Sequence, residues 1–368
     1  MEQKDFSYQF YKTTSEAWDA MYQALLSAQK SIFWEIFIFV DDIAGSRFVD
    51  ALCEKARSGL EVKIIIDAYG SFSFSWAAER RLRDAGVEVL RFNRLHPELR
   101  LARWLARLWF RNHRKVLIVD EWVVFLGGVN IHAAYQSWDD MYLKLAGPLA
   151  RPLLRGFAKS YISAGGEKRN VRKLLGTKLS DDLKLWKEKF KFIVHSPRFK
   201  KISKTRRLFV QALTVAKESV NFLTPYFVPD KQFLQAVALA RRRGVKVNIF
   251  LPLRTDSKLL ELLALTYYGH TLKAGANIYF LPTMNHGKAM SVDNTLGHVG
   301  SINITPRSFY FNEESGVSFS DERMVNDLNV LFNEWKKIAQ PFDEERWKKR
   351  GVWSKIKEWW VRRVENFL

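Results

Sequence analysis

Two stretches of the chain carry histidine, lysine and aspartate at one shared spacing, H-x-K-x-x-x-x-D. The members are His113, Lys115 and Asp120 in the first motif, and His286, Lys288 and Asp293 in the second. Near neutral pH, imidazole can act as a nucleophile or as a general acid or base, and lysine can stabilise anionic oxygens. A paired motif of this kind indicates phosphoryl transfer, with all six residues as candidate catalytic residues.

Polar residues follow both motifs at matching distances. The first motif is followed by Gly127, Gly128 and Asn130, and the second by Gly300, Ser301 and Asn303, at identical offsets from the histidines. We expect Asn130, Ser301 and Asn303 to bind phosphate oxygens. Since Gly128 stands where the second half has Ser301, only one half offers that hydroxyl.

The motifs also predict how their side chains are positioned. On a strand, residues i and i+2 face one side, so each His and Lys should project together. Asp120 and Asp293 fall where the strand turns, so holding that turn is an alternative role for them.

Carboxylates for the histidines come from further along the chain. Asp140 and Glu314 follow their histidines by 27 and 28 residues, each before an apolar run. We expect both to orient imidazole rings; the alternative is a surface carboxylate at the start of a strand. No acidic cluster of metal-ligand type lies nearby, so we expect neither a metal nor another cofactor.

Four blocks recur in the same order in both halves, which predicts a duplicated α/β unit. Helical patterns alternate with short β-branched runs, and Thr13 with Glu16 forms a plausible capping box. We expect two repeats related by a pseudo-two-fold axis, with mixed sheets flanked by helices. The predicted domains are a first repeat at 1–165, a basic connector at 166–207, a second repeat at 208–340 and a basic aromatic helix at 341–368.

One insertion breaks the repeat. Gly86 and Gly275 are 189 positions apart, whereas His113 and His286 are 173 apart, so the first half holds 16 more residues, near 95–110. As a helix, this segment carries apolar and basic stripes, and the C-terminal segment does likewise. We expect membrane contact through Arg100, Arg103, Trp104, Leu105, Arg107, Leu108, Trp353 and Trp360, with docking on the core as the alternative.

Net charge, cysteine count and the length of apolar runs indicate which partners and which compartment to expect. With 59 Lys+Arg against 39 Asp+Glu, the 368 residues carry a net charge of +20, most of it in the segments 94–115, 184–207 and 346–368. Such charge indicates a polyanionic partner, either a nucleic acid or an anionic membrane. A single cysteine, Cys53, excludes an intramolecular disulfide and favours a reducing compartment. The start of the chain does not resemble a secretory signal, and no apolar run reaches the ~20 residues of a transmembrane helix.

Together these features resemble the phospholipase D superfamily and, within it, bacterial cardiolipin synthases. The resemblance covers about residues 14–365 and rests on both motifs and on IFWEIFIFVDDIAG, IIIDAYGS, FLGGVNI, TPYFVPD and GSINITPRSF. It is similar to the shorter form that lacks the two N-terminal membrane helices of the longer synthases.

The resemblance implies an active site between the halves and a phosphohistidine intermediate, with His113 as nucleophile and His286 as acid and base. The implied reaction joins two phosphatidylglycerol molecules into cardiolipin and releases glycerol. It also implies a peripheral protein on the cytoplasmic face of a bacterial inner membrane, with an anionic phospholipid partner and no nucleic acid. A phospholipase D, a phosphatidylserine synthase-type enzyme, a nuclease of the same superfamily and an inactive lipid binder remain alternatives. The oligomeric state stays open.

Overall fold

The computed structural model describes residues 6–94, 109–177, 188–197, 203–349 and 351. The chain divides into two compact units. Unit 1 comprises Met1–Phe199, Val299–Ser301 and Phe311–Val317, and unit 2 comprises Lys200–His298, Ile302–Tyr310 and Ser318–Leu368. Two short segments of the second sequence repeat therefore belong to unit 1. The domain boundaries expected from the sequence stay a prediction.

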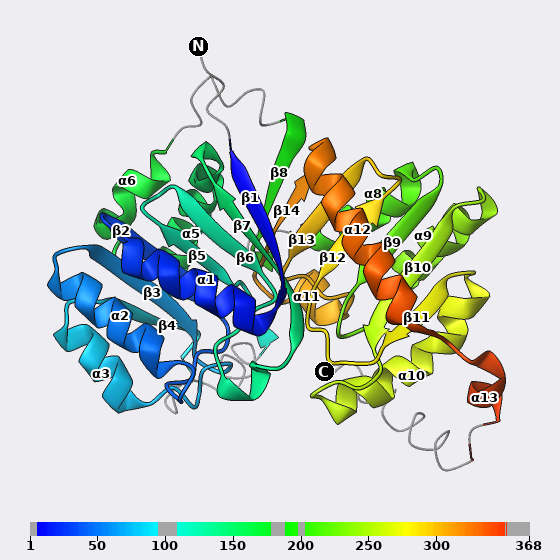
Figure 1. Ribbon diagram of the computed structural model, residues 1–368, viewed down its shortest axis with the longest axis horizontal. Helices are drawn as coiled ribbons and strands as arrows, with labels where there is room; N and C mark the ends of the chain where they lie inside the picture. The colour runs from blue at the N-terminus through cyan, green and yellow to red at the C-terminus, as the bar shows by residue number, and fades with distance from the viewer. Residues whose placement is uncertain (1–5, 95–108, 178–187, 198–202, 350, 352–368) are drawn as a thin grey trace. The chain divides into compact units, whose positions relative to one another are not determined.

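Unit 1 is built on a seven-stranded mixed sheet in the order β1-β7-β6-β5-β2-β3-β4 (Figure 1). Strands β2, β3 and β4 run parallel to one another. The neighbouring pairs β2–β5, β5–β6, β6–β7 and β7–β1 are antiparallel. The strands are β1 Ser7–Thr13, β2 Ser31–Ile36, β3 Glu61–Asp67, β4 Glu88–Phe92, β5 Val116–Val119, β6 Val123–Gly127 and β7 Asp139–Ala146. The helices are α1 Thr14–Ser27, α2 Ser46–Arg57, α3 Trp76–Asp84, α5 Arg151–Ser163 and α6 Arg172–Leu175.

Helices cover both faces of this sheet because its central strands are apolar on both sides. Strand β2 is buried along its whole length. Ile32, Trp34 and Ile36 face the core beneath α1, α2 and α3, whereas Phe33 lies 5.2 Å, centroid to centroid, from Phe157 of α5. The expected capping box is confirmed: Glu16 N–H donates to Thr13 Oγ1 over 3.2 Å, and Thr13 N–H donates to Glu16 Oε2 over 3.3 Å.

The second sheet has eight strands in the order β15-β11-β10-β9-β12-β13-β14-β8. The strands are β8 Phe190–His195, β9 Ser219–Leu223, β10 Lys246–Pro252, β11 Asn277–Leu281, β12 Ala289–Val292, β13 Leu296–Gly300, β14 Glu314–Phe319 and β15 Gln340–Pro341. The helices are α8 Lys204–Val215, α9 Lys231–Arg242, α10 Lys258–Lys273, α11 Pro306–Tyr310, α12 Glu322–Ile338 and α13 Glu344–Lys348. Rings of α8 and α9 contact Phe222, and Phe332 of α12 contacts Phe250, so helices again lie on both faces.

The two sheets share one topology. The order β7-β6-β5-β2-β3-β4 in the first matches β14-β13-β12-β9-β10-β11 in the second. The parallel strands β9, β10 and β11 and the antiparallel pair β9–β12 repeat the directions found around β2. The predicted duplicated α/β fold with mixed sheets flanked by helices is confirmed.

The aspartate of each motif lies at the tip of a β-hairpin. Asp120 and Glu121 between β5 and β6, and Asp293 and Asn294 between β12 and β13, all have positive φ. Two consecutive left-handed residues are typical of tight hairpin turns, and Asp and Asn tolerate this conformation better than most residues.

Each aspartate side chain also holds the start of the neighbouring strand. Asp120 accepts backbone N–H groups from residues 29, 30 and 31 at 2.7–3.1 Å. Asp293 accepts those of residues 217, 218 and 219 at 2.6–2.8 Å. In both repeats the motif aspartate thus ties the hairpin to the first parallel strand of its sheet.

Replacing this carboxylate should destabilise the fold. We expect Asp120→Ala to lower the free energy of unfolding by about 2–3 kcal/mol, since three backbone donors lose a charged acceptor. Guanidinium unfolding followed by circular dichroism measures the change. Asp50→Ala is the matched control: its carboxylate pairs with Arg81 on the surface, and its loss should cost less than ~1 kcal/mol. Equal losses in the two variants would contradict the structural role of Asp120.

Candidate active site

His113 and Lys115 lie just before β5, not within a strand as the sequence pattern predicted. The segment around His113 pairs instead with residues that precede β14. Asn112 bridges Glu313 in parallel, His113 N–H donates to the Glu313 carbonyl over 2.9 Å, and Glu313 N–H donates to the Arg111 carbonyl over 2.8 Å. This pairing draws residues 111–114 away from the hairpin that would have extended β5. His286 and Lys288 likewise precede β12.

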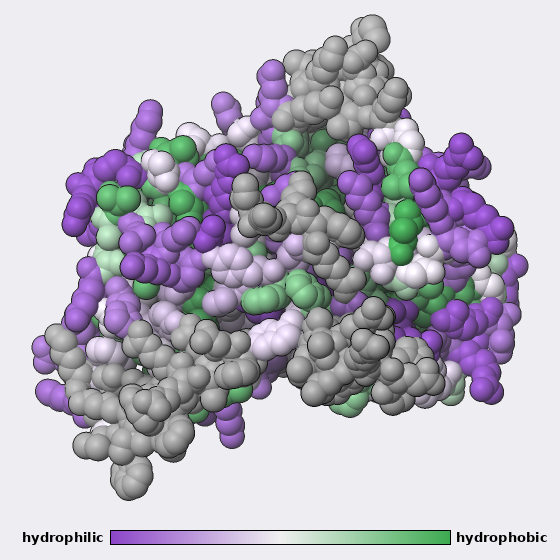
Figure 2. All heavy atoms as spheres, turned by 180° about the vertical axis from the view of Figure 1, so that it is seen from behind, coloured by the Kyte–Doolittle hydropathy of each residue, from purple (hydrophilic) through white to green (hydrophobic). Residues whose placement is uncertain are grey.

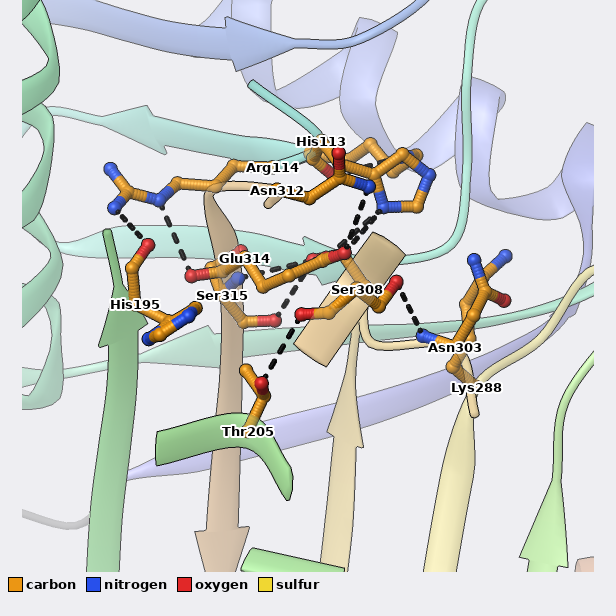
Figure 3. Close-up of polar contacts among 12 residues, drawn as sticks. His113, Arg114, His195, Thr205, Lys288, Asn303, Ser308, Asn312, Glu314 and Ser315 are labelled. Atoms are coloured by element: carbon orange, nitrogen blue, oxygen red, sulfur yellow. Dashed lines mark hydrogen bonds and ion pairs between the residues drawn. The ribbon is translucent and has the colours of Figure 1, made fainter. Parts of the chain in front are cut away.

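The pairing places a carboxylate of the second repeat on the histidine of the first. His113 Nδ1 lies 3.0 Å from Glu314 Oε2 and 3.1 Å from Oε1, and the two side chains point at each other in Figure 3. Glu314 is fully buried, and His113 is 7% exposed. The Ser301 hydroxyl donates to Glu314 Oε2, and Asn312 Nδ2 lies 3.5 Å from Oε1.

This arrangement determines which ring nitrogen of His113 is available for chemistry. An ionised carboxylate only accepts hydrogen bonds, so the proton of a neutral His113 ring is held on Nδ1. The lone pair then lies on Nε2, as a nucleophilic imidazole requires. The Phe37 ring, whose centroid lies 4.9 Å from that of the His113 ring in an edge-to-face arrangement, further limits how the imidazole can turn.

The motif lysines bend back towards their own histidines. Lys115 Nζ donates to the His113 carbonyl over 2.9 Å and lies 4.9 Å from the centroid of Phe37. Lys288 Nζ donates to the His286 carbonyl. Both lysines are almost completely buried, so each ammonium is held close to its histidine within its own unit.

Arg114 anchors the segment from the side opposite to His113. It is buried and donates to the Ser160 hydroxyl, to the His195 carbonyl over 2.8 Å and, from Nε, to the Glu314 carbonyl over 3.3 Å. Its Nη1 also lies 3.5 Å from carboxylate oxygens of Glu35 and Glu313. One guanidinium therefore faces two buried carboxylates and the backbone of the strand that carries Glu314.

A second buried pair continues this support. Arg111 Nε and Nη2 donate to Asp67 Oδ1 over 2.9 and 2.5 Å, and Asn112 N–H donates to Asp67 Oδ2 over 2.9 Å. Asn112 Nδ2 donates to Glu35 Oε2 over 3.0 Å. The C-terminal ends of β3 and β2 are thereby connected to the two residues that precede His113.

Sequence reasoning missed Arg111, Asn112, Arg114 and Phe37. One signal was present, because Glu35 interrupts the ten-residue apolar run SIFWEIFIFV. A carboxylate on a fully buried strand needs an internal partner, which the chain supplies in Arg114 and Asn112.

In unit 2, His286 is 5% exposed and its ring lies 6.0 Å from that of Tyr226. The Tyr226 hydroxyl donates to Asp256 Oδ1 over 2.5 Å. Asn303, also buried, lies with Oδ1 3.5 Å from the Thr224 hydroxyl, and its backbone N–H donates to Ser308 Oγ over 3.2 Å (Figure 3).

The other expected site residues occupy varied positions. Asp140 is buried at the start of β7, where Oδ1 accepts the Met141 N–H. Asn130 Oδ1 accepts the Ile38 N–H over 3.1 Å, and the Ser301 hydroxyl is engaged by Glu314. The roles assigned to them remain predictions. The expected membrane contacts at 100–108, and at Trp353 and Trp360, lie outside the described residues.

The described residues also bear on metal binding and membrane spanning. Within those ranges, no group of three His, Cys, Asp or Glu side chains is arranged to hold a metal ion. No helix in the described part of the chain has the length and hydropathy needed to span a bilayer.

Comparisons with known proteins agree on one family. Residues 21–150 and 209–336 each match the family described as "Cardiolipin synthase, PLD-like domain". The chain is 28% identical to a probable cardiolipin synthase of Bacillus subtilis, over 97% of this chain and 71% of that protein. It is 31% identical to the cardiolipin synthase of Geobacillus thermodenitrificans, over 93% of this chain and 68% of the relative.

The fold also matches a solved structure. Phosphatidylserine synthase from Haemophilus influenzae aligns with a TM-score of 0.73 at 14% identity, over 98% of this chain and 93% of that one. At this identity the match supports the architecture alone.

The buried cluster around Arg114 predicts a pH dependence of stability. Burial raises the pKa of Glu35 above its ordinary value of 4.5, although Arg114 and Asn112 act in the opposite direction. The folded protein therefore holds this proton more tightly than the unfolded chain does. The resulting stabilisation is complete below pH 4.5 and is lost as the pH rises through the raised pKa.

In the Glu35→Gln variant this side chain is neutral at every pH, so the variant does not lose this stabilisation as the pH rises. We expect its free energy of unfolding to increase relative to that of the wild type as the pH rises from 4.5. The difference should grow by up to about 1.4 kcal/mol per pH unit until the pH passes the raised pKa of Glu35. Urea unfolding across a pH series measures the difference. The exposed Glu54→Gln serves as control, and parallel pH curves for Glu35→Gln and wild type would contradict the prediction.

Proposed function

Since the chain belongs to the cardiolipin synthase family with the PLD-like domain, we propose that it is a phosphatidyltransferase that makes cardiolipin from phosphatidylglycerol. The single observation that carries the mechanism is the buried pairing of His113 Nδ1 with Glu314. This pairing supports His113 as the nucleophile, acting through Nε2. The enzyme works at a membrane surface, on the cytoplasmic face of the bacterial inner membrane.

The first step of the proposed reaction transfers a phosphatidyl group to the enzyme. His113 Nε2 attacks the phosphorus of phosphatidylglycerol, and an N–P bond forms while the P–O bond to the glycerol headgroup breaks. His286 donates a proton to the departing glycerol oxygen. The Glu314 carboxylate stabilises the positive charge that the His113 ring carries in the intermediate.

The second step returns the enzyme to its starting state. The neutral His286 removes a proton from the headgroup hydroxyl of a second phosphatidylglycerol, whose oxygen attacks the phosphorus. A P–O bond forms, the N–P bond breaks, and cardiolipin leaves. Lys115, Lys288, Asn130 and Asn303 stabilise the non-bridging phosphate oxygens in both steps. No metal ion takes part in this scheme.

Product analysis tests the reaction. Purified protein incubated with phosphatidylglycerol vesicles should release cardiolipin and glycerol in equal amounts, measured by mass spectrometry. His113→Ala and His286→Ala should each lower the rate at least 10³-fold, since each removes a group that forms or breaks a bond. Release of phosphatidic acid in place of cardiolipin would overturn the transferase assignment in favour of a phospholipase.

A substrate with an acidic leaving group separates the two histidines. A phosphatidyl p-nitrophenol needs no proton donor to depart, so His286→Ala should still form the covalent adduct. The adduct should be found on His113 by peptide mass spectrometry after a rapid quench, whereas His113→Ala should form none. An adduct on His286 in the His113→Ala variant would reverse the assignment.

The positioning role of Glu314 gives a further prediction. Glu314→Gln keeps the size of the side chain but removes the charge that faces the imidazolium. We expect kcat to fall by about 10- to 100-fold with little change in KM, as for other groups that orient a catalytic histidine. Steady-state kinetics with the exposed Glu322→Gln as control measure this split. A rise in KM at unchanged kcat would instead indicate a role in lipid binding.

A further inference from the structure

Unit 1 displays four large apolar side chains on the loops that follow β2 and β3 and at the first residue of α3. Figure 2 shows hydrophilic side chains along much of one face of the molecule, as on most protein surfaces, so an apolar cluster on exposed loops needs a reason. The exposed fractions are 86% for Ile43, 52% for Tyr69, 80% for Phe72 and 63% for Trp76. We refer to these four residues as the loop patch.

Hydrogen bonds join the two loops close to each member of the patch. The Ser71 hydroxyl donates to the Phe37 carbonyl over 2.9 Å and accepts the Phe39 N–H over 3.0 Å. Asp41 accepts the Ser75 N–H over 2.8 Å and the Ser75 hydroxyl over 2.5 Å. Each member therefore lies within two residues of a contact that joins the loops.

The turn that carries Ile43 is itself fixed. Asp42 Oδ1 accepts the N–H groups of Ala44 and Gly45 over 3.0 and 3.1 Å, and Asp42 Oδ2 accepts the Ala133 N–H over 2.7 Å. Ile43 is thus held outward at the tip of an ordered turn. Its exposure is built into the loop and does not come from a loose conformation.

The patch borders the residues around His113. Asp67, which binds Arg111 and Asn112, also accepts the N–H groups of Tyr69 and Gly70 over 3.0 and 2.9 Å. The Arg111 guanidinium lies 5.6 Å from the centroid of the Tyr69 ring. The loops and the nucleophile segment therefore share one buried acceptor at the end of β3.

One exposed arginine, Arg94, lies beside the aromatic part of the patch. Arg91 and Arg94 lie with their guanidinium carbons 4.6 and 5.1 Å from the centroid of the Trp76 ring. Arg94 is exposed, whereas Arg91 is also paired with Glu79. Tryptophan and tyrosine favour the boundary between water and lipid, and arginine favours anionic headgroups.

The second repeat lacks these features at the matching positions. In the alignment of VDDI with VPDK, Lys231 stands where the first repeat has Ile43, and Asp230 caps α9 through the Phe233 N–H. The loop after β10 reads LRTDS, so Arg254 replaces Tyr69. The loop after β10 exposes Leu253 at 46%, but the four apolar positions of the loop patch are not repeated, so they are not needed to form the shared fold.

We propose that the loop patch inserts into an anionic lipid bilayer and positions the His113 side of unit 1 at the membrane surface. The choice of a bilayer over another protein rests on the proposed function, whose substrate is a membrane lipid, and on the exposed Arg94 beside Trp76. Insertion of these tips to the depth of the lipid headgroups removes apolar surface from water without any transmembrane segment.

A site-specific probe tests insertion directly. Cys53 is buried, so a cysteine introduced by Phe72→Cys can be labelled selectively with an environment-sensitive fluorophore. Its emission should shift to the blue on addition of vesicles of phosphatidylglycerol and phosphatidylcholine, and much less with phosphatidylcholine alone. Val330→Cys, at an exposed position of α12, is the control and should not shift. No shift at position 72, equal shifts at 72 and 330, or a shift that depends on protein concentration without vesicles would overturn the proposal.

Vesicle partitioning gives an independent measure. Ile43→Gln combined with Phe72→Gln should lower the partition coefficient for anionic vesicles by about tenfold or more, because two apolar side chains no longer leave water. Leu239→Gln combined with Val330→Gln removes two apolar residues of α9 and α12 that are 55% and 54% exposed, and should leave partitioning within about twofold. Equal losses in both double variants would contradict a specific surface.

Activity assays distinguish the membrane role of the loop patch from the proposed synthesis of cardiolipin. The Ile43→Gln, Phe72→Gln variant should make cardiolipin at the wild-type rate when the lipid is dispersed in detergent micelles, and more slowly from vesicles. If the wild-type protein makes cardiolipin but position 72 does not insert, the loop patch is refuted and the function stands. If position 72 inserts but no cardiolipin forms, the function is refuted and the surface stands.

Discussion

The parallel pairing of residues 111–114 with 311–314 is the constraint on which the candidate site depends. It buries His113, Glu313 and Glu314 together, in a place where water cannot satisfy them. A buried carboxylate is tolerated only with donors or a cation close by, and Arg114, Ser301 and Asn312 supply them. The contacts that offset the desolvation cost of these buried carboxylates also fix the orientation of the imidazole. Stability and chemistry therefore rely on the same atoms.

The two repeats have one topology but use it unequally. Both place an aspartate at a hairpin tip, and both turn a lysine back to the carbonyl of its histidine. Only the second repeat has a hydroxyl at the position of Ser301, and this hydroxyl holds the carboxylate that faces the histidine of the first repeat. Gly128, at the matching position, cannot make such a contact. The sequence difference between Gly128 and Ser301 thus corresponds to a hydrogen bond that holds Glu314 in place.

Much of the fold could be predicted from the sequence because its signals are local. The apolar run at Ser31–Ile36, the capping box at Thr13 and the turn at Asp120 depend on neighbouring residues, and the duplication is visible as an ordered repeat. The partner of Glu314 could not be predicted. Its spacing associates it with His286, whereas the contact with His113 depends on which segments pair across some 200 residues. Likewise, nothing in the sequence around Phe72 distinguishes an exposed aromatic from a core one.

The position of Glu314 also bears on how such a chain can evolve. A duplication begins with two copies that are each complete, and either copy can drift or be lost while the other works. Once a segment of one copy supplies the carboxylate that orients the histidine of the other, that freedom ends. A first repeat expressed alone would lack the carboxylate that faces His113, so the two copies can diverge in sequence but cannot be separated without loss of this contact.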